Sequence, residues 1–163
     1  MGSCPICSND DLVAQGAYRG SHSIFEGMQR TSCRSCGMVF ANPMPSDKAL
    51  EQYNSSYFST AHGDQPRGAS SVAFFTGIAR LRLEYIQRYL SKNNIAVSRV
   101  LELGPGPGFF ARAWLEKHPA TEYLACETDT SCHASLQRLG VKLLDGFPLD
   151  LGSKTFDLVV SRG

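Results

Sequence analysis

Two pairs of cysteines near the N-terminus have the spacing of metal ligands. The thiols belong to the motifs CPIC and CRSC, which are 25 residues apart, at positions Cys4, Cys7, Cys33 and Cys36. Two C-x-x-C turns are typical of a tetrahedral structural zinc site, because each turn contributes two thiolates. Iron binds the same ligand set and is the main alternative metal. Such a site leaves no open position for a substrate, so we expect the metal to stabilise the fold.

A glycine-rich loop follows an apolar stretch in the second half of the chain. VLELGPGPGFF contains three alternate glycines, Gly104, Gly106 and Gly108. The pattern G-x-G-x-x-A is shared with dinucleotide-binding loops, but Pro105 and Pro107 have no N–H to offer to a phosphate. Glu102, just before the loop, would repel a phosphate and favours a cationic group. S-adenosylmethionine has a sulfonium and an ammonium group and no phosphate, and glycines allow close backbone approach to it.

ELGPGPG resembles motif I of the class I S-adenosylmethionine-dependent methyltransferases, in which an acid precedes three alternate glycines. The resemblance implies a Rossmann-like sheet whose loop holds the cofactor through Glu102, Gly104, Pro105, Gly106 and Gly108. Glu127 ends the next strand, 19 residues after Gly108. This is close to the spacing of roughly 20 residues expected for a carboxylate that accepts hydrogen bonds from ribose hydroxyls.

The third strand of this half of the chain ends in LLDGF. The resemblance implies that Asp145 accepts a hydrogen bond from the adenine amino group and that Phe147 packs on the ring. An aspartate before glycine is also common in turns for conformational reasons alone, which is the alternative interpretation of Asp145.

The order of motifs along the chain is similar to that of bacterial methyltransferases with an N-terminal zinc ribbon. CPIC, CRSCGMVFANPMPS, YNSSYF and motif I follow one another. Some of these enzymes act on sugars or other small metabolites, so the resemblance implies a small-molecule methyl acceptor. Their aromatic segment, here Tyr53, Tyr57 and Phe58, can fold over the cofactor. Packing of the ribbon onto the catalytic domain is the alternative role for these aromatic residues.

Alternating helices and strands must position the loop and the acids. Apolar residues recur every three or four positions over 72–92, which predicts an amphipathic helix capped by Ser70 or Ser71. The segments that follow are strand SRVLEL, helix FFARAWLEKH, strand TEYLACE, a helix over 130–139, and strands VKLLD and TFDLVV. This order predicts βαβ units and a mostly parallel sheet, and therefore an α/β fold.

We expect three zones along the chain: a zinc ribbon over 1–45, a polar linker with the aromatic segment over 46–71, and the N-terminal part of a methyltransferase domain over 72–163. The first zone contains one strand-like run, MVFANP. The resembled family builds seven strands in the order 3-2-1-4-5-7-6, so the resemblance implies an incomplete sheet of strands 1–4, truncated after the fourth. The acceptor half of the site and its general base are then not identified. FDLVV would form an exposed apolar edge through which copies could associate.

Composition narrows the classes of partner. The formal net charge is +1 with acidic and basic residues interspersed, so the sequence shows no nucleic-acid footprint. It contains neither an apolar run long enough to cross a bilayer nor a signal-peptide pattern, and we expect a cytoplasmic protein. Cys126 and Cys132 have no neighbour at ligand spacing and are predicted to be buried thiols.

Two other functions are compatible with parts of the sequence. A zinc ribbon on a degenerate Rossmann-like fragment would be a binding module without catalysis, for which Arg30 and Arg34 could supply charge. An NAD-dependent oxidoreductase would explain the glycine pattern, but Glu102 and the two prolines of the loop disfavour it.

Overall fold

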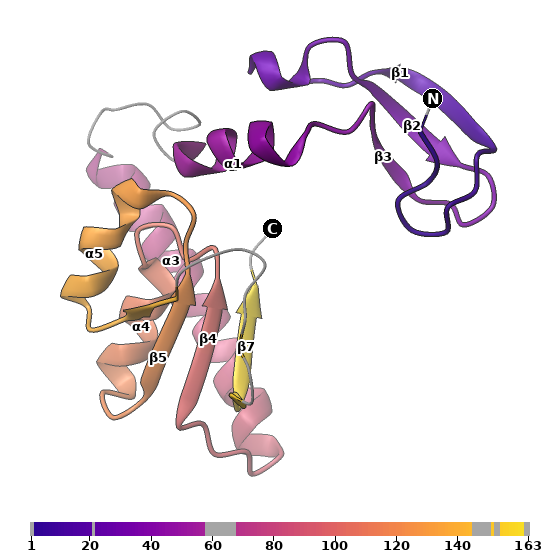
Figure 1. Ribbon diagram of the computed structural model, residues 1–163. Coiled ribbons are helices and arrows are strands. Elements are labelled where there is room, and N and C mark those ends of the chain that lie inside the picture. Colours follow the sequence, from indigo (N-terminus) through magenta and orange to yellow (C-terminus); the bar gives the residue numbers. More distant parts are fainter. Residues whose placement is uncertain (1, 21, 58–67, 145–150, 152–153, 162–163) are drawn as a thin grey trace. The chain divides into compact units, whose positions relative to one another are not determined.

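The computed structural model describes residues 2–20, 22–57, 68–144, 151 and 154–161 (Figure 1). The chain forms two compact units, Met1–Tyr53 and Asn54–Gly163. Among the described residues, no helix combines the length and the hydrophobicity needed to span a membrane.

The first unit is a small antiparallel sheet. Its strands are β1 (Leu12–Ala17), β2 (Gln29–Cys33) and β3 (Val39–Asn42), with β2 in the centre. The buried cluster beneath it consists of Cys4, Cys33 and Phe40, against which Leu12 packs. So small an apolar cluster stabilises a fold only weakly, and two of its three members are the cysteines predicted to bind metal.

β3 is the one strand of this sheet that the sequence predicts, and it confirms the strand expected for MVFANP. β1 is mostly exposed, and its register with β2 shifts between Ala14 and Ala17, where Gly16 has a φ of 119°. β2 is largely polar. Neither strand has the apolar alternation that indicates a strand, because this small sheet has little core to bury.

Helix α1 (Asp47–Ser55) lies where the polar composition predicts a linker. Ser46 caps the N-terminus of α1, because its hydroxyl accepts a hydrogen bond from the Ala49 N–H at 3.3 Å. Asp47 adds a negative charge to the first turn, which the helix dipole favours. Near its end, Tyr53 packs its ring on Phe25, with the centroids 5.5 Å apart. Local capping therefore forms a helix in a segment with few apolar residues.

The second unit contains a four-stranded parallel sheet. Its strands are β4 (Arg99–Leu103), β5 (Glu122–Cys126), β6 (Lys142–Leu143) and β7 (Leu158–Ser161), in the order β6-β5-β4-β7. The mixed α/β fold with a parallel sheet is therefore confirmed. The order also equals 3-2-1-4 when the four strands are counted along the chain, as expected for the first four strands of the resembled fold.

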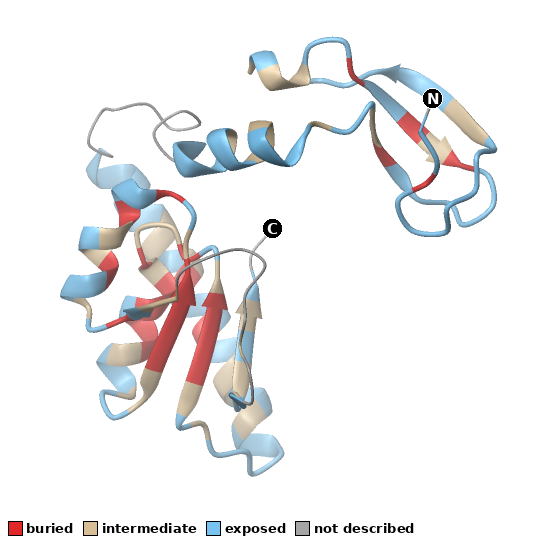
Figure 2. Ribbon diagram, in the orientation of Figure 1, coloured by how far each residue is buried: buried red, intermediate tan, exposed pale blue. Residues whose placement is uncertain are grey.

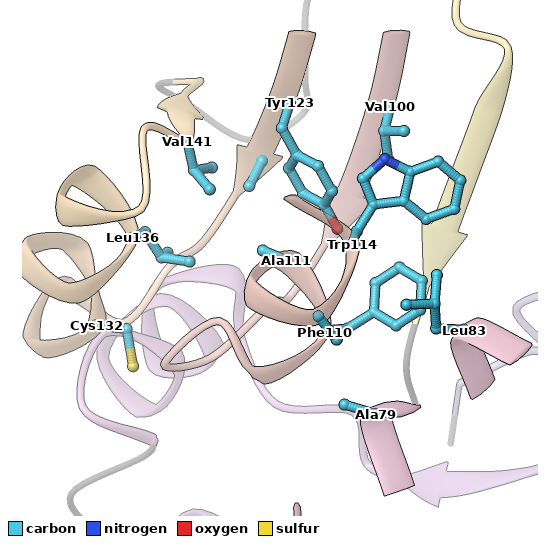
Figure 3. Close-up of a cluster of buried hydrophobic side chains, with 12 residues drawn as sticks. Ala79, Leu83, Val100, Phe110, Ala111, Trp114, Tyr123, Cys132, Leu136 and Val141 are labelled. Carbon is cyan, nitrogen blue, oxygen red and sulfur yellow. The ribbon is translucent and has the colours of Figure 1, made fainter. Parts of the chain in front are cut away.

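Helices α3 (Ala69–Lys92), α4 (Phe109–Lys117) and α5 (His133–Arg138) belong to this unit, and the short helix η2 (Thr130–Cys132) precedes α5. Their positions agree with the predicted helices. The predicted serine cap of α3 is wrong, because Gly68 is the N-cap and makes no side-chain hydrogen bond there. The helices and the strands share one buried cluster (Figure 3), whose larger members are Leu83, Phe110, Trp114, Tyr123 and Leu136.

β7 forms one edge of this sheet and, unlike β4 and β5, has no buried residue, as Figure 2 shows. The side chain of Val159 is 55% exposed. Asp157, at its entry, fastens it to the start of β4. One carboxylate oxygen accepts hydrogen bonds from the Ser98 N–H at 2.8 Å, the Ser98 hydroxyl at 2.9 Å and the Arg99 N–H at 2.8 Å. These bonds lower the pKa of Asp157, because they stabilise the charged form.

Candidate functional site

The four N-terminal cysteines come together in the first unit. All four sulfur atoms lie within 4.8 Å of one another, and the Cys4–Cys36 and Cys7–Cys33 sulfur pairs are each 3.6 Å apart. Zinc–sulfur bonds of about 2.3 Å in a regular tetrahedron place the sulfurs about 3.8 Å apart. The cluster therefore has the donor set and the size of a four-thiolate metal site.

Tight turns of the backbone present these sulfurs. In the first turn, the Cys4 N–H donates to the Asn9 carbonyl at 2.8 Å and the Ser8 N–H donates to the Cys4 carbonyl at 2.9 Å. In the second turn, Gly37 has a φ of 75° and its N–H donates to the Cys33 carbonyl at 2.9 Å. The left-handed conformation explains why glycine follows the second pair.

The thiols influence one another's ionisation. The pKa of Cys4 falls to about 7, chiefly because the backbone N–H of Cys7 bonds to its sulfur. The Met38 N–H also lowers the pKa of Cys36, but the neighbouring Cys7 thiol, burial and the other two cysteines raise it to about 12. Four negative charges at these distances repel one another, and a divalent cation among them would remove that conflict.

The second candidate site is the loop that joins β4 to α4. Gly104, Gly106 and Gly108 have φ values of 67°, 56° and 86°, which residues with side chains rarely adopt. A Cβ on Gly108 would lie 2.9 Å from methyl groups of Leu136 and Leu139, whereas a Cβ on Gly104 would meet no atom within 4 Å. The last glycine is therefore needed for packing against α5 and the chain beyond it. The first leaves open space beside the backbone.

The structure brings Gly106 and Glu127 together. The Gly106 N–H donates to one oxygen of the Glu127 carboxylate at 2.6 Å, and the Asp129 N–H donates to the other oxygen at 2.9 Å. Glu127 is half-buried, directly beyond the end of β5. The sequence identifies the loop and the acid separately. In the structure they are joined by a hydrogen bond at the carboxyl ends of two adjacent strands.

Two residues of the α5 region hold the loop and Glu127 in place. Their roles could not be predicted from the sequence. Ser135 donates its hydroxyl to the Pro107 carbonyl at 3.1 Å, and His133 donates its Nε2 hydrogen to the Glu127 carbonyl at 2.8 Å. Their roles depend on how the crossover after β5 returns to the sheet. Composition and spacing contain no signal for that geometry.

Glu102 lies deeper than the loop. Its side chain is 0% exposed and accepts a hydrogen bond from the Tyr123 hydroxyl at 2.7 Å. Pro105 is fully buried as well. Strand register explains the contact, because Glu102 pairs with Ala125 and the side chain two residues earlier on β5 points to the same face of the sheet. The structure therefore places this carboxylate in the interior of the sheet, next to the strand end from which the loop begins.

Other sequence-predicted residues separate into three groups. Asp145, Phe147 and Phe58 lie outside the described residues. Tyr53 packs within the first unit, as described above, and Tyr57 is exposed. Cys126 and Cys132 are buried thiols, as predicted, and burial raises the pKa of Cys126, with a further contribution from the Glu127 charge.

The glycine loop occupies the position where parallel α/β sheets bind ligands. The chain leaves β4 towards β5 on one side, and β7 pairs with β4 on the other side. The strand order therefore reverses at β4. Ligands of such sheets bind beyond the carboxyl ends of the strands at this reversal.

Comparisons with known proteins add the following. No protein-family model matches the chain, and no curated protein is significantly similar to it. Among solved structures, the plantazolicin methyltransferase BpumL in complex with SAH is similar at 11% identity with a TM-score of 0.47, covering 70% of this chain and 48% of that one. The same enzyme in complex with a monoazolic desmethylPZN analog and SAH gives 13% identity and a TM-score of 0.46, covering 69% and 47%. This chain thus spans about half the length of both.

Proposed function

We propose that this chain carries the S-adenosylmethionine-binding half of a methyltransferase that acts on a small molecule. The observation that carries the proposal is the bond between the Gly106 N–H and the Glu127 carboxylate, 2.6 Å long. It joins a loop of left-handed glycines to an acid beyond the neighbouring strand. Both lie at the carboxyl edge of a parallel sheet where the strand order reverses.

The hydrogen bonds of the loop disfavour a phosphate ligand. Pro105 and Pro107 have no N–H. The other three residues of the loop use theirs within the protein: Gly104 N–H to the Cys126 carbonyl at 2.9 Å, Gly106 N–H to Glu127, and Gly108 N–H to the Pro105 carbonyl at 3.2 Å. A pyrophosphate relies on free N–H donors at this position. A dinucleotide such as NAD is therefore a poor ligand for residues 104–108.

The same arrangement suits S-adenosylmethionine, which has no phosphate. Each oxygen of Glu127 accepts one backbone N–H and keeps capacity to accept a ribose hydroxyl. The open space beside Gly104 allows the ligand to approach the backbone. An ionised Glu102 carboxylate would favour a cation near the strand end. We propose the adenine roles for Asp145 and Phe147 on the family resemblance alone.

S-adenosylmethionine would supply a methyl group activated by its sulfonium. The residues of this chain would bind and orient the methyl donor, and orientation is the main contribution to such a transfer. The acceptor and any general base are not among the residues assigned here. We further propose that another strand covers the open edge of β7, where Val159 is 55% exposed, with a second copy as one source of that strand.

We also propose that the four cysteines hold a structural zinc ion, with iron as the alternative. The four sulfurs, all within 4.8 Å of one another, would fill a tetrahedral coordination shell and leave no place for a substrate. The ion would stabilise a unit whose buried cluster has three residues. Reduced cysteines in this arrangement are consistent with a cytoplasmic location.

Calorimetric titration tests the ligand assignment. SAH is the product that remains when S-adenosylmethionine loses its methyl group, and we expect the full chain to bind SAH with about micromolar affinity and NAD not at all. Glu127→Ala should weaken SAH binding at least tenfold. Glu116→Ala, which removes an exposed acid of α4, is the matched control and should bind normally. Binding of NAD without binding of SAH would contradict the proposal.

A further inference from the structure

Helix α3 has an apolar face that the described residues of the second unit leave exposed. Ala79 and Leu83 are buried against the sheet and α4. On the opposite side, Phe74, Leu81, Tyr85 and Tyr89 are 63%, 64%, 75% and 60% exposed. One helix with two apolar faces, only one of which is buried in its own unit, is typical of a surface that binds a partner.

The spacing on this outer face is that of a helix–helix interface. Phe74, Ile78, Leu81 and Tyr85 follow one another at intervals of four, three and four residues. This is the alternation of d and a positions along a coiled-coil seam. We call these four residues the α3 seam. The pattern predicts that the occupant of the seam is itself a helix with matching spacing.

Gly77 lies beside the seam in the middle of the helix. Glycine lowers helix stability relative to alanine, so its presence in a helix interior calls for a reason. The packing of the described residues of the second unit provides none, because a Cβ on Gly77 would meet no atom within 4 Å. Close approach of a second helix at this point would provide one, since a residue without a side chain lets two backbones come near each other.

The charges at the two ends of α3 favour an antiparallel orientation of two copies. Lys92 and Arg88, which pairs with Glu84 of the same helix at 3.7 Å, lie towards the C-terminal end, Arg80 and Arg82 lie in the middle, and residues 69–73 at the N-terminal end carry no charge. Two parallel copies would bring the cationic ends together. Antiparallel copies place each cationic end beside an uncharged end and oppose the helix dipoles favourably.

We propose that two copies of this chain associate through their α3 seams in antiparallel orientation. A twofold axis between Ile78 and Leu81 puts Phe74 of one copy opposite Tyr85 of the other, and Ile78 opposite Leu81. The seam is therefore complementary to itself: each end layer pairs two aromatic rings and each central layer pairs two aliphatic side chains. Such an isologous contact closes on itself and gives a dimer.

The exposed area of the seam fits a weak dimer. Aromatic side chains bury about 150–250 Å² each when fully covered, so the seam residues Phe74, Leu81 and Tyr85 at their exposed fractions offer about 400 Å² per copy. Two copies would bury roughly 800 Å² from these side chains alone, which is in the range of weak interfaces. This inference does not depend on the proposed methyl transfer, because no seam residue belongs to the glycine loop.

Sedimentation velocity of the full chain, from about 1 to 200 µM, tests the proposal in the range expected for an interface of this size. The weight-average mass should rise with concentration from 17.8 kDa towards twice that value. Leu81→Glu places like charges next to the twofold axis and should raise the dimer dissociation constant at least tenfold. Ala73→Glu adds the same charge at an exposed position of α3 outside the seam and should leave the dimer intact.

Three results would overturn the proposal: a wild-type chain that is monomeric throughout, a dimer that survives Leu81→Glu, or a dimer that is lost only on Val159→Lys, which would assign association to β7. Circular dichroism checks that each variant is folded. If Leu81→Glu does not fold, Tyr85→Ala replaces it, since it removes an end layer while keeping a good helix former. A dimer unchanged by Tyr85→Ala would then count against the α3 seam.

Discussion

The two units stabilise the backbone around their candidate sites in different ways. In the first unit, the buried cluster consists of two cysteines and Phe40, so two of its three members are candidate metal ligands. In the second unit, twelve described residues, most of them in helices and strands, pack together, and the glycine loop lies at the end of a strand that this core already holds. The first unit should therefore depend on a ligand for its fold, whereas the second should fold first and bind afterwards.

Loss of the proposed metal should have the largest effect, and it should be confined to the first unit. Structural zinc contributes about 10 kcal/mol or more to comparable small folds. We expect Cys33→Ser, or a strong chelator, to unfold β1–β3 and leave the second unit folded. Amide NMR spectra measure this directly, together with metal content by mass spectrometry. Cys132→Ser, a buried thiol of the second unit, is the control and should retain one metal ion per chain.

Replacing one glycine in each unit by alanine should have a smaller effect, and the two stability losses can be compared. Gly37 and Gly108 have φ values of 75° and 86°, so alanine costs each about 1–2 kcal/mol for backbone conformation. Gly108→Ala should cost more in total, because its Cβ would meet Leu136 and Leu139 at 2.9 Å, while a Cβ on Gly37 meets nothing. Chemical denaturation of each unit measures the difference. Equal losses at the two positions would show that packing against α5 does not constrain the loop.

Low pH should destabilise the second unit by protonating Asp157. Its pKa lies below the ordinary value of 3.8 because the Ser98 and Arg99 N–H groups and the Ser98 hydroxyl bond to the carboxylate. A carboxyl group with a lowered pKa stabilises the fold above its unfolded pKa, and this contribution is lost as pH falls through the folded pKa. Asp157→Asn should therefore lower the melting temperature at pH 7 by a few degrees and have little effect near pH 2. A loss of equal size at both values would rule out this linkage.

The sequence predicts the second unit better than the first for a physical reason. β4 and β5 are short continuous buried runs, as expected of strands in a parallel sheet, and α4 buries residues at helical spacing. Gly104 to Gly108 mark the turn between β4 and α4. β1 and β2 are polar or exposed and depend on pairing between distant residues and on the cysteines. α1 depends on the Ser46 cap more than on an apolar stripe. The pattern of apolar residues indicates a helix or a strand only where that element packs against a hydrophobic core.

The candidate site could be predicted only in part. Gly106 and Glu127 follow from spacing along a parallel sheet, and the four cysteines follow from two turns. The Tyr123–Glu102 contact could have been found by pairing the two strands in register, since both side chains face the same side. Ser135 and His133 could not, because their contacts depend on the three-dimensional path of the α5 crossover.

The most direct test of the central claim is the change in backbone amide chemical shifts when SAH is added to the full chain. We predict that the largest shifts cluster at the glycine loop and around Glu127, with the Gly106 amide among them, because its 2.6 Å bond to that carboxylate would respond to a ligand bound there. Residues of the first unit should be unaffected, and NAD should produce no comparable pattern. SAH that leaves the loop unchanged, or NAD that shifts it more strongly, would contradict the assignment.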